Sequence, residues 1–172
     1  MEQTALKQIR ILAIALTARG FGYCVMENQV ILESGHKEVG GNKNSQTVYK
    51  IEKLLKQFLP NLLVLQDVNA KGCHRAPRIK SLYRQVIELA AKYKLKATLL
   101  SGILLREALL GDAKGTKFEM AEMLARKYSA ELAVKLPPKR RPWENEDGRM
   151  DIFDAVGLAV VFRMSENEEF CR

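Results

Sequence analysis

Three short apolar runs joined by two hairpin-sized turns open the chain, and this pattern constrains the fold more than any other feature. Residues 9–35 read IRILAIALTARGFGYCVMENQVILESG. The segments 9–16, 21–27 and 29–35 have the β-branched, apolar composition of strands, and connections this short imply antiparallel pairing. The turn ARGFG joins the first two segments, and we expect Gly20 or Gly22 to supply its backbone geometry.

Helical and strand-like segments alternate after these strands. A Gly/Asn-rich loop (35–46) leads into a helical pattern from Val48 to Phe58, which Pro60 ends. The nearly continuous apolar run 61–68 predicts a strand that is buried on both faces. A further strand is expected at 95–100, and helices at 77–93, 101–111, 116–128 and 149–164. The helix at 116–128 begins with the capping-box spacing of Thr116 and Glu119.

This order of elements predicts an α/β fold that resembles the ribonuclease H-like arrangement. We expect a mixed five-stranded sheet, with three antiparallel strands followed by two parallel strands and with helices on both faces. The 172 residues suit a single domain (1–172). A basic, Pro-rich loop at about 135–148 cannot form regular structure.

Composition limits the cellular compartments and the binding partners that we expect for this protein. The formal net charge is +8, which favours polyanionic partners. No secretory signal begins the chain and no apolar run reaches the length of a membrane span, so we expect a cytoplasmic protein with no membrane partner. The three scattered cysteines predict reduced thiols, and the pair Cys73 and His74 lacks the further ligands of a zinc site.

Carboxylates occur where the chemistry of such a sheet would be expected. Ligands of open α/β sheets collect at the carboxyl ends of the strands. Asp151 and Asp154 share one face near the start of the last predicted helix, and Asp67 follows the buried strand. On pattern alone we favour a purely structural role for these acids, in which the helix acids interact with the helix dipole and Asp67 accepts hydrogen bonds within its own loop.

Three motifs nevertheless resemble those of a known family in order and spacing. The stretches ILAIALTARGFGYCVM…ESG, LVLQDV and DIFDAVGLAVV are similar to motifs of the RuvC family of Holliday-junction resolvases, members of the ribonuclease H-like superfamily. The resemblance covers almost the whole chain and looks closest to small RuvC-like proteins outside the well-studied resolvases. It implies a dimeric nuclease in which a strand-one Asp, a strand-four Glu and two helix Asp hold two divalent metals, Mg²⁺ or Mn²⁺.

Only part of that acid set is present. Asp151 and Asp154 match the helix acids and are the candidate metal ligands, whereas Ala15 and Gln66 stand where the two strand acids are expected. Asp67 follows Gln66, but neighbouring strand side chains point to opposite faces, so its use would need a bulge. We interpret the loss as a natural degeneration and not as an engineered one, because a knockout would not need Leu16 where a Pro often follows the acid.

The resemblance therefore favours a catalytically impaired, nucleic-acid-binding relative of the metal-dependent resolvases. Two alternatives stay open. One is an active, Mg²⁺-dependent, structure-selective DNA endonuclease that uses Asp67, Asp151 and Asp154. The other is a non-catalytic protein-interaction subunit with the same fold. In the favoured case no cofactor is needed.

Basic residues supply the candidate binding surface. Two runs without acids flank the proposed site, one after the fourth strand and one before the last helix, and phosphate contacts are the expected role of such cations. The candidate residues in these runs are Lys71, Arg75, Arg78, Lys80, Arg84, Lys139, Arg140 and Arg141, and Arg19 joins them from the turn after the first strand. We expect branched or duplex DNA as the partner and a homodimer as the assembly. For Trp143 we favour packing against Pro137 and Pro138 over stacking on an exposed base.

Overall fold

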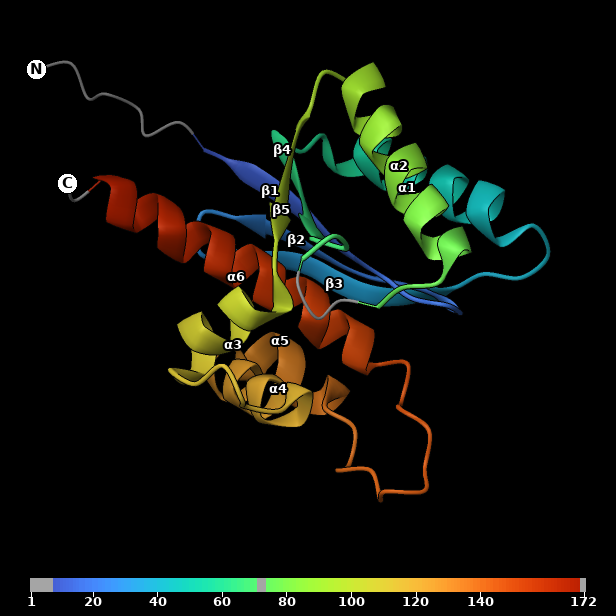
Figure 1. Cartoon of the computed structure of the whole chain (residues 1–172). Coiled ribbons are helices and arrows are strands. Elements are labelled where there is room, and N and C mark those ends of the chain that lie inside the picture. The colour runs from blue at the N-terminus through green and yellow to red at the C-terminus, as the bar shows by residue number, and fades with distance from the viewer. Residues whose placement is uncertain (1–7, 71–73, 171–172) are drawn as a thin grey trace, which may run out of the picture.

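A five-stranded mixed sheet forms the centre of the protein (Figure 1). The computed structural model describes residues 8–70 and 74–170. The strand order is β3-β2-β1-β4-β5, in which β1 pairs antiparallel with β2 and parallel with β4, and β2–β3 is antiparallel while β4–β5 is parallel. The strands are β1 (Arg10–Leu16), β2 (Gly20–Glu27), β3 (Val30–Glu38), β4 (Leu62–Gln66) and β5 (Lys96–Leu100). The predicted sheet is thereby confirmed.

Helices cover both faces of this sheet (Figure 1). One face packs against α1 (Lys43–Phe58) and α2 (Pro77–Lys92). The other packs against α6 (Met150–Phe170), which contacts β1 to β4. On the same side α3 (Gly102–Leu110) and α4 (Lys117–Lys127) pack against α6, and α5 (Ser129–Leu132), followed by the short 3₁₀ helix η1 (Ala133–Lys135), packs against α4. No helix in the described part of the chain has both the length and the apolar character needed to cross a membrane.

The side chains of β1 divide between the two faces. Leu12, Ile14 and Leu16 belong to the core under α1 and α2, whereas Ala13 and Ala15 belong to the core under α6. This is the period-two alternation of a strand buried on both faces. Small residues line the α6 side, where this long helix crosses the centre of the sheet. Ala15 therefore points towards α6.

Gly22 permits the close approach of α6 to the sheet. A Cβ atom at Gly22 would lie 2.0 Å from the carbonyl oxygen of Asp151, and one at Gly20 would lie 1.9 Å from that of Lys37. Neither glycine has a positive φ, and both lie within β2. The prediction that they supply turn geometry is wrong, because contact with neighbouring backbone, and not backbone conformation, excludes a side chain at both positions.

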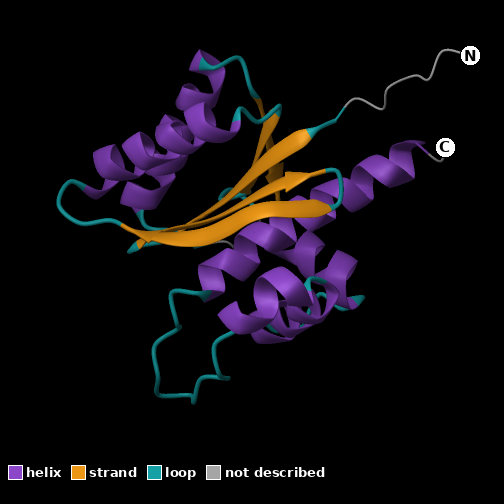
Figure 2. Cartoon of the chain, turned by 180° about the vertical axis from the view of Figure 1, so that it is seen from behind, coloured by secondary structure: helices purple, strands orange, loops and turns teal. Residues whose placement is uncertain are grey.

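Several predicted boundaries also need correction. β3 continues to Glu38, where a loop was expected from residue 35, because the first residues of β2 pair with 36–38. α1 begins at Lys43, five residues before its expected start at Val48, and α6 runs to Phe170, beyond 164. The capping box of α4 is confirmed, and α5 and η1 were not predicted. The Pro-rich loop, defined from here as residues 136–149, is irregular and extends away from the helices (Figure 2).

Candidate functional site

A cavity of about 220 Å³ lies where the carboxyl ends of β1 and β4 meet the start of α6. Ala15, Gln66, Asp151 and Asp154 all line it. The pairing of Ile14 with Leu65 brings the next residues of the two parallel strands side by side. Gln66 faces α6 because Val64 and Leu62, two and four positions earlier, pack on that side. The four positions singled out in the sequence thus converge.

Asp151 is almost fully buried at the floor of this cavity. Thr17 Oγ1 donates a hydrogen bond to Asp151 Oδ2 at 3.2 Å. His36 Nδ1 lies 3.2 Å from the same oxygen, at ion-pair distance but without hydrogen-bond geometry. Burial, and secondarily the negative charge of Asp154, raise the pKa of Asp151 to about 7. The carboxyl group is therefore partly protonated at neutral pH.

Asp154, one helical turn further along α6, forms an ion pair with the side chain of Lys117. Lys117 Nζ lies 2.9 Å from Asp154 Oδ2 and 2.6 Å from Glu146 Oε1. Burial raises the pKa of Asp154, and the charge of Lys117 opposes that rise. For Lys117, burial acts to lower the pKa, but the two carboxylates outweigh it and the pKa is raised. The ammonium group therefore stays charged.

Glu146 completes an acidic cluster that sequence patterns did not indicate. Glu146, Asp151 and Asp154 each place a carboxylate oxygen within 4.8 Å of the others. Glu146 belongs to the Pro-rich loop, and Arg19 Nη2 donates a hydrogen bond to its carbonyl oxygen at 2.9 Å. Since it comes from a loop, no helical or strand spacing marks it. Sequence patterns also did not indicate Lys117 on α4 and His36 on β3, because only the fold brings them near α6.

Gln66 and Asp67 have different surroundings. Gln66 Oε1 accepts a hydrogen bond from Arg75 Nη2 at 3.0 Å, within the cavity lining. Asp67 does not line the cavity, and its Oδ1 accepts a hydrogen bond from the backbone N–H of Asn69 at 2.9 Å. The structure therefore places Asp67 as a loop-stabilising residue and does not bring it to Asp151 and Asp154.

The predicted basic residues fall into separate groups. Arg19 and Arg75 line the cavity of about 220 Å³ that holds Asp151 and Asp154, called the acidic cavity from here. Arg78 lies nearby, and its Nη2 donates a hydrogen bond to the carbonyl oxygen of Ala18 at 3.0 Å. Lys80 and Arg84 line a different cavity that shares no residue with the first. Lys71 lies outside the described residues.

The remaining basic residues lie on the Pro-rich loop. Lys139 and Arg140 line a second cavity beside the first. The Arg141 guanidinium lies 5.7 Å from the centre of the Trp143 ring. Trp143 is 76% exposed, so the prediction that it packs against the prolines is wrong. The loop that carries it projects from the helices (Figure 2).

Comparison with solved structures identifies the fold. Thermus thermophilus RuvC in complex with a Holliday junction substrate superposes with a TM-score of 0.65 at 14% identity, covering 91% of this chain and 96% of that one. Thermus thermophilus RuvC alone gives 0.62 at 15% identity, with 89% and 92% covered. The yeast mitochondrial Holliday junction resolvase gives 0.62 at 15% identity, with 95% and 83% covered. At these identities the likeness shows a shared RuvC-type, ribonuclease H-like fold.

No protein-family model and no curated protein matches the sequence.

The residues present do not fit a pair of divalent metals. Ala15 offers no ligand atom, and the amide oxygen of Gln66 is bonded to Arg75. Two of the three carboxylates in the acidic cluster already pair with Lys117, whose single positive charge lowers the net negative charge of the cluster. Two divalent cations would meet too little negative charge here and would face the ammonium group directly.

Proposed function

We propose that the protein binds nucleic acid with a resolvase-type fold and has lost most or all metal-dependent cleavage. The observation that carries this proposal is the position of Lys117. Its ammonium group bridges Asp154 and Glu146 in the same cavity where Ala15 and Gln66 replace the expected strand acids. In this arrangement one positive charge from within the chain pairs with two of the acids, and we propose that the protein requires no cofactor.

Branched or duplex DNA is the partner that we propose. Arg19 and Arg75 at the acidic cavity, with Arg78 beside them, present cations at the edge of the sheet where ligands of this fold class collect. One solved protein with this fold is described as a complex with a Holliday junction substrate. We further propose a homodimer, since two copies related by a two-fold axis would match the symmetry of such a junction.

The second candidate function is an active endonuclease with Mg²⁺ or Mn²⁺. The proximity of Glu146, Asp151 and Asp154 favours it, with Glu146 in the role that the sequence assigned to Asp67. This alternative requires a divalent ion to displace Lys117 from two carboxylates, and Asp151 to lose its proton.

A cleavage assay on a synthetic four-way junction separates these functions. We expect retention of the junction at low salt and no Mg²⁺- or Mn²⁺-dependent cutting. We also expect the combined substitution Ala15→Asp, Gln66→Glu and Lys117→Met to create metal-dependent cutting, with Asp154→Asn in that background as the inactive control. Cutting by the unmodified chain that disappears in Asp154→Asn would establish the nuclease instead.

Retention of DNA is measured separately from cleavage. Binding of the junction that weakens steeply with salt supports the proposed function. If the protein retains neither junction nor duplex at low salt, the protein-interaction role becomes the better account of the fold.

A further inference from the structure

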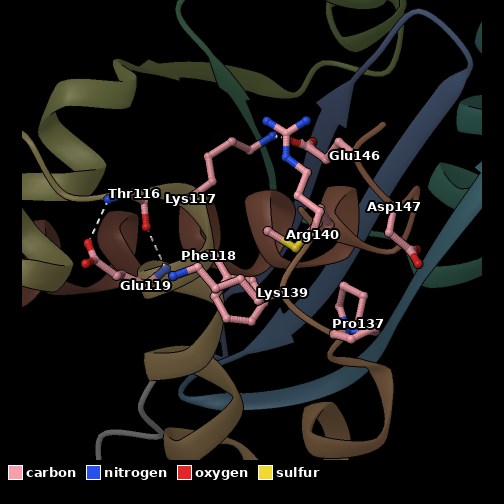
Figure 3. Close-up of a pocket in the computed structure, with 11 residues that line it drawn as sticks. Thr116, Lys117, Phe118, Glu119, Pro137, Lys139, Arg140, Glu146 and Asp147 are labelled. Atoms are coloured by element: carbon pink, nitrogen blue, oxygen red, sulfur yellow. Dashed lines mark hydrogen bonds and ion pairs between the residues drawn. The ribbon is translucent and has the colours of Figure 1, made fainter. Parts of the chain in front are cut away.

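A second cavity, of about 350 Å³, lies between the start of α4 and the Pro-rich loop (Figure 3). Figure 3 shows residues from α4 on one side and from the loop on the other. Phe118, Pro137 and Met150 give it an apolar part. It shares Lys117 and Glu146 with the acidic cavity, so the two are adjacent.

The lining of this second cavity holds three cations, Lys117, Lys139 and Arg140, and three acids. Its three acids all have partners: Glu119 accepts from the Thr116 backbone N–H at 2.8 Å, Glu146 binds Lys117, and Asp147 pairs with Arg149 at 2.7 Å. Lys139 makes no hydrogen bond or ion pair with any described residue. Its neighbour Arg140 donates only to a backbone carbonyl oxygen, that of Glu144, at 3.1 Å. Both cations are thus available for an anionic ligand.

A short turn next to these cations presents the aromatic ring of Trp143. The backbone N–H of Glu144 donates to the carbonyl oxygen of Arg141 at 3.0 Å, and the Glu144 carboxylate accepts from the Arg141 N–H at 2.8 Å. These bonds hold Trp143 inside a closed turn while its side chain stays exposed. An indole held in this way has no packing role within the described part of the chain. The Arg141 guanidinium lies 5.7 Å from the centre of the ring, and the exposed remainder of the indole can take a flat ligand.

We propose that the Pro-rich loop binds an unpaired nucleic-acid strand. One base enters the second cavity against Phe118 and Pro137, the phosphates meet Lys139 and Arg140, and a neighbouring base stacks on Trp143. Cations that follow the backbone, together with aromatic faces that take successive bases, are the combination by which proteins hold single strands. The inference rests on the proposed function and names the form of nucleic acid that this loop recognises.

Trp143 gives a direct optical test, because it is the single tryptophan of the chain. We expect a mixed-sequence single-stranded DNA to quench its emission in a saturable way, and a blunt duplex of equal length to leave it unchanged. Binding of fluorescently labelled DNA is then followed by anisotropy in variants. Trp143→Ala should weaken single-strand binding by about tenfold, the range of one lost base stack, and Lys139→Ala by a few-fold. Trp143→Ala should not alter duplex binding.

Two matched substitutions control for surface changes of the same kind. Tyr49→Ala removes an exposed aromatic ring that also lies beside a cation, Lys53, but on α1. Lys96→Ala removes one exposed positive charge at the start of β5, the opposite end of that strand from the cavities. Both controls should bind single-stranded DNA as the unmodified protein does.

The outcomes separate this inference from the proposed function. If the protein retains junction or duplex DNA but Trp143→Ala and Lys139→Ala bind single strands normally, only the present inference is overturned. Unchanged Trp143 emission on saturation with single-stranded DNA, or equal competition by polyglutamate, overturns it as well. If no form of DNA is retained at low salt, both proposals fail.

Discussion

At the scale of single residues, the contact of Lys117 with two carboxylates is the feature that most distinguishes the site. Its side chain is 41% exposed and that of Asp154 25%, so solvent screens the pairs in part. Lys117→Met should lower the free energy of unfolding by about 1 kcal/mol, because Asp154 and Glu146 then lose their counter-charge. Urea denaturation measures the change, with Lys114→Met, an exposed position, as the control. An unchanged stability would show that the ammonium group contributes little to folding.

The buried carboxyl group of Asp151 predicts a particular dependence of stability on pH. Its pKa is about 7 in the folded protein and near 3.8 when unfolded, so between these values only the folded state holds the proton. Stability from this group is therefore present at low pH and falls as pH rises from about 4 to 7. Asp151→Asn should flatten that fall. The free energy of unfolding of the variant minus that of the unmodified protein should therefore be more positive at pH 8 than at pH 5.

Urea denaturation at the two pH values checks this prediction. The groups that face Asp151 are Thr17, His36, Asp154, Glu146 and Lys117, and all of them remain in Asp151→Asn. Glu88→Gln, at an exposed position of α2, removes a carboxylate without burial and should leave the pH dependence as it is. The same slope in Asp151→Asn and in the unmodified protein would contradict a raised pKa.

At the scale of elements, the junction of β2 and α6 depends on the missing side chain of Gly22. A methyl group there would lie 2.0 Å from a backbone oxygen of α6, and backbone cannot move aside as a flexible side chain can. Gly22→Ala should reduce the free energy of unfolding by about 3 kcal/mol. Gly40→Ala is the matched control, since a Cβ there meets nothing within 4 Å and its φ is not positive. Equal stability of the two variants would mean that α6 shifts at little cost.

The elements also show why sequence patterns located only part of the site. Strand alternation and the parallel crossover place Ala15 and Gln66 side by side, and helical spacing places Asp151 and Asp154 on one face, so these four could be predicted. His36 lies in the last part of β3, where the apolar sequence pattern has already ended. The strand continues there because it pairs with β2, and not because its side chains are buried. Lys117 and Glu146 meet Asp154 through the packing of α4 and the course of an irregular loop, which have no period to detect.

At the scale of the whole molecule, the fold was predictable because few topologies accept two hairpin connections followed by two crossovers. The distribution of charge over the molecule was harder to predict from the sequence. Basic residues that look like one continuous run in the sequence separate in space: Arg75 lies with Arg19 at the acidic cavity, whereas Lys80 and Arg84 line another. The net charge of +8 therefore does not describe one surface. Binding of DNA should depend on the first group and much less on the second.

The salt dependence of junction binding tests this separation. Each phosphate contact contributes about 0.9 to the slope of log K against log salt concentration, so Arg19→Ala combined with Arg75→Ala should reduce the magnitude of the slope by about 2. Lys96→Ala combined with Arg126→Ala removes the same charge from exposed positions on β5 and α4 and should leave the slope unchanged. Equal slopes for the two double variants would mean that net charge alone attracts DNA. A selective loss in the first would instead locate the bound backbone beside the cavity where Lys117 holds the acids.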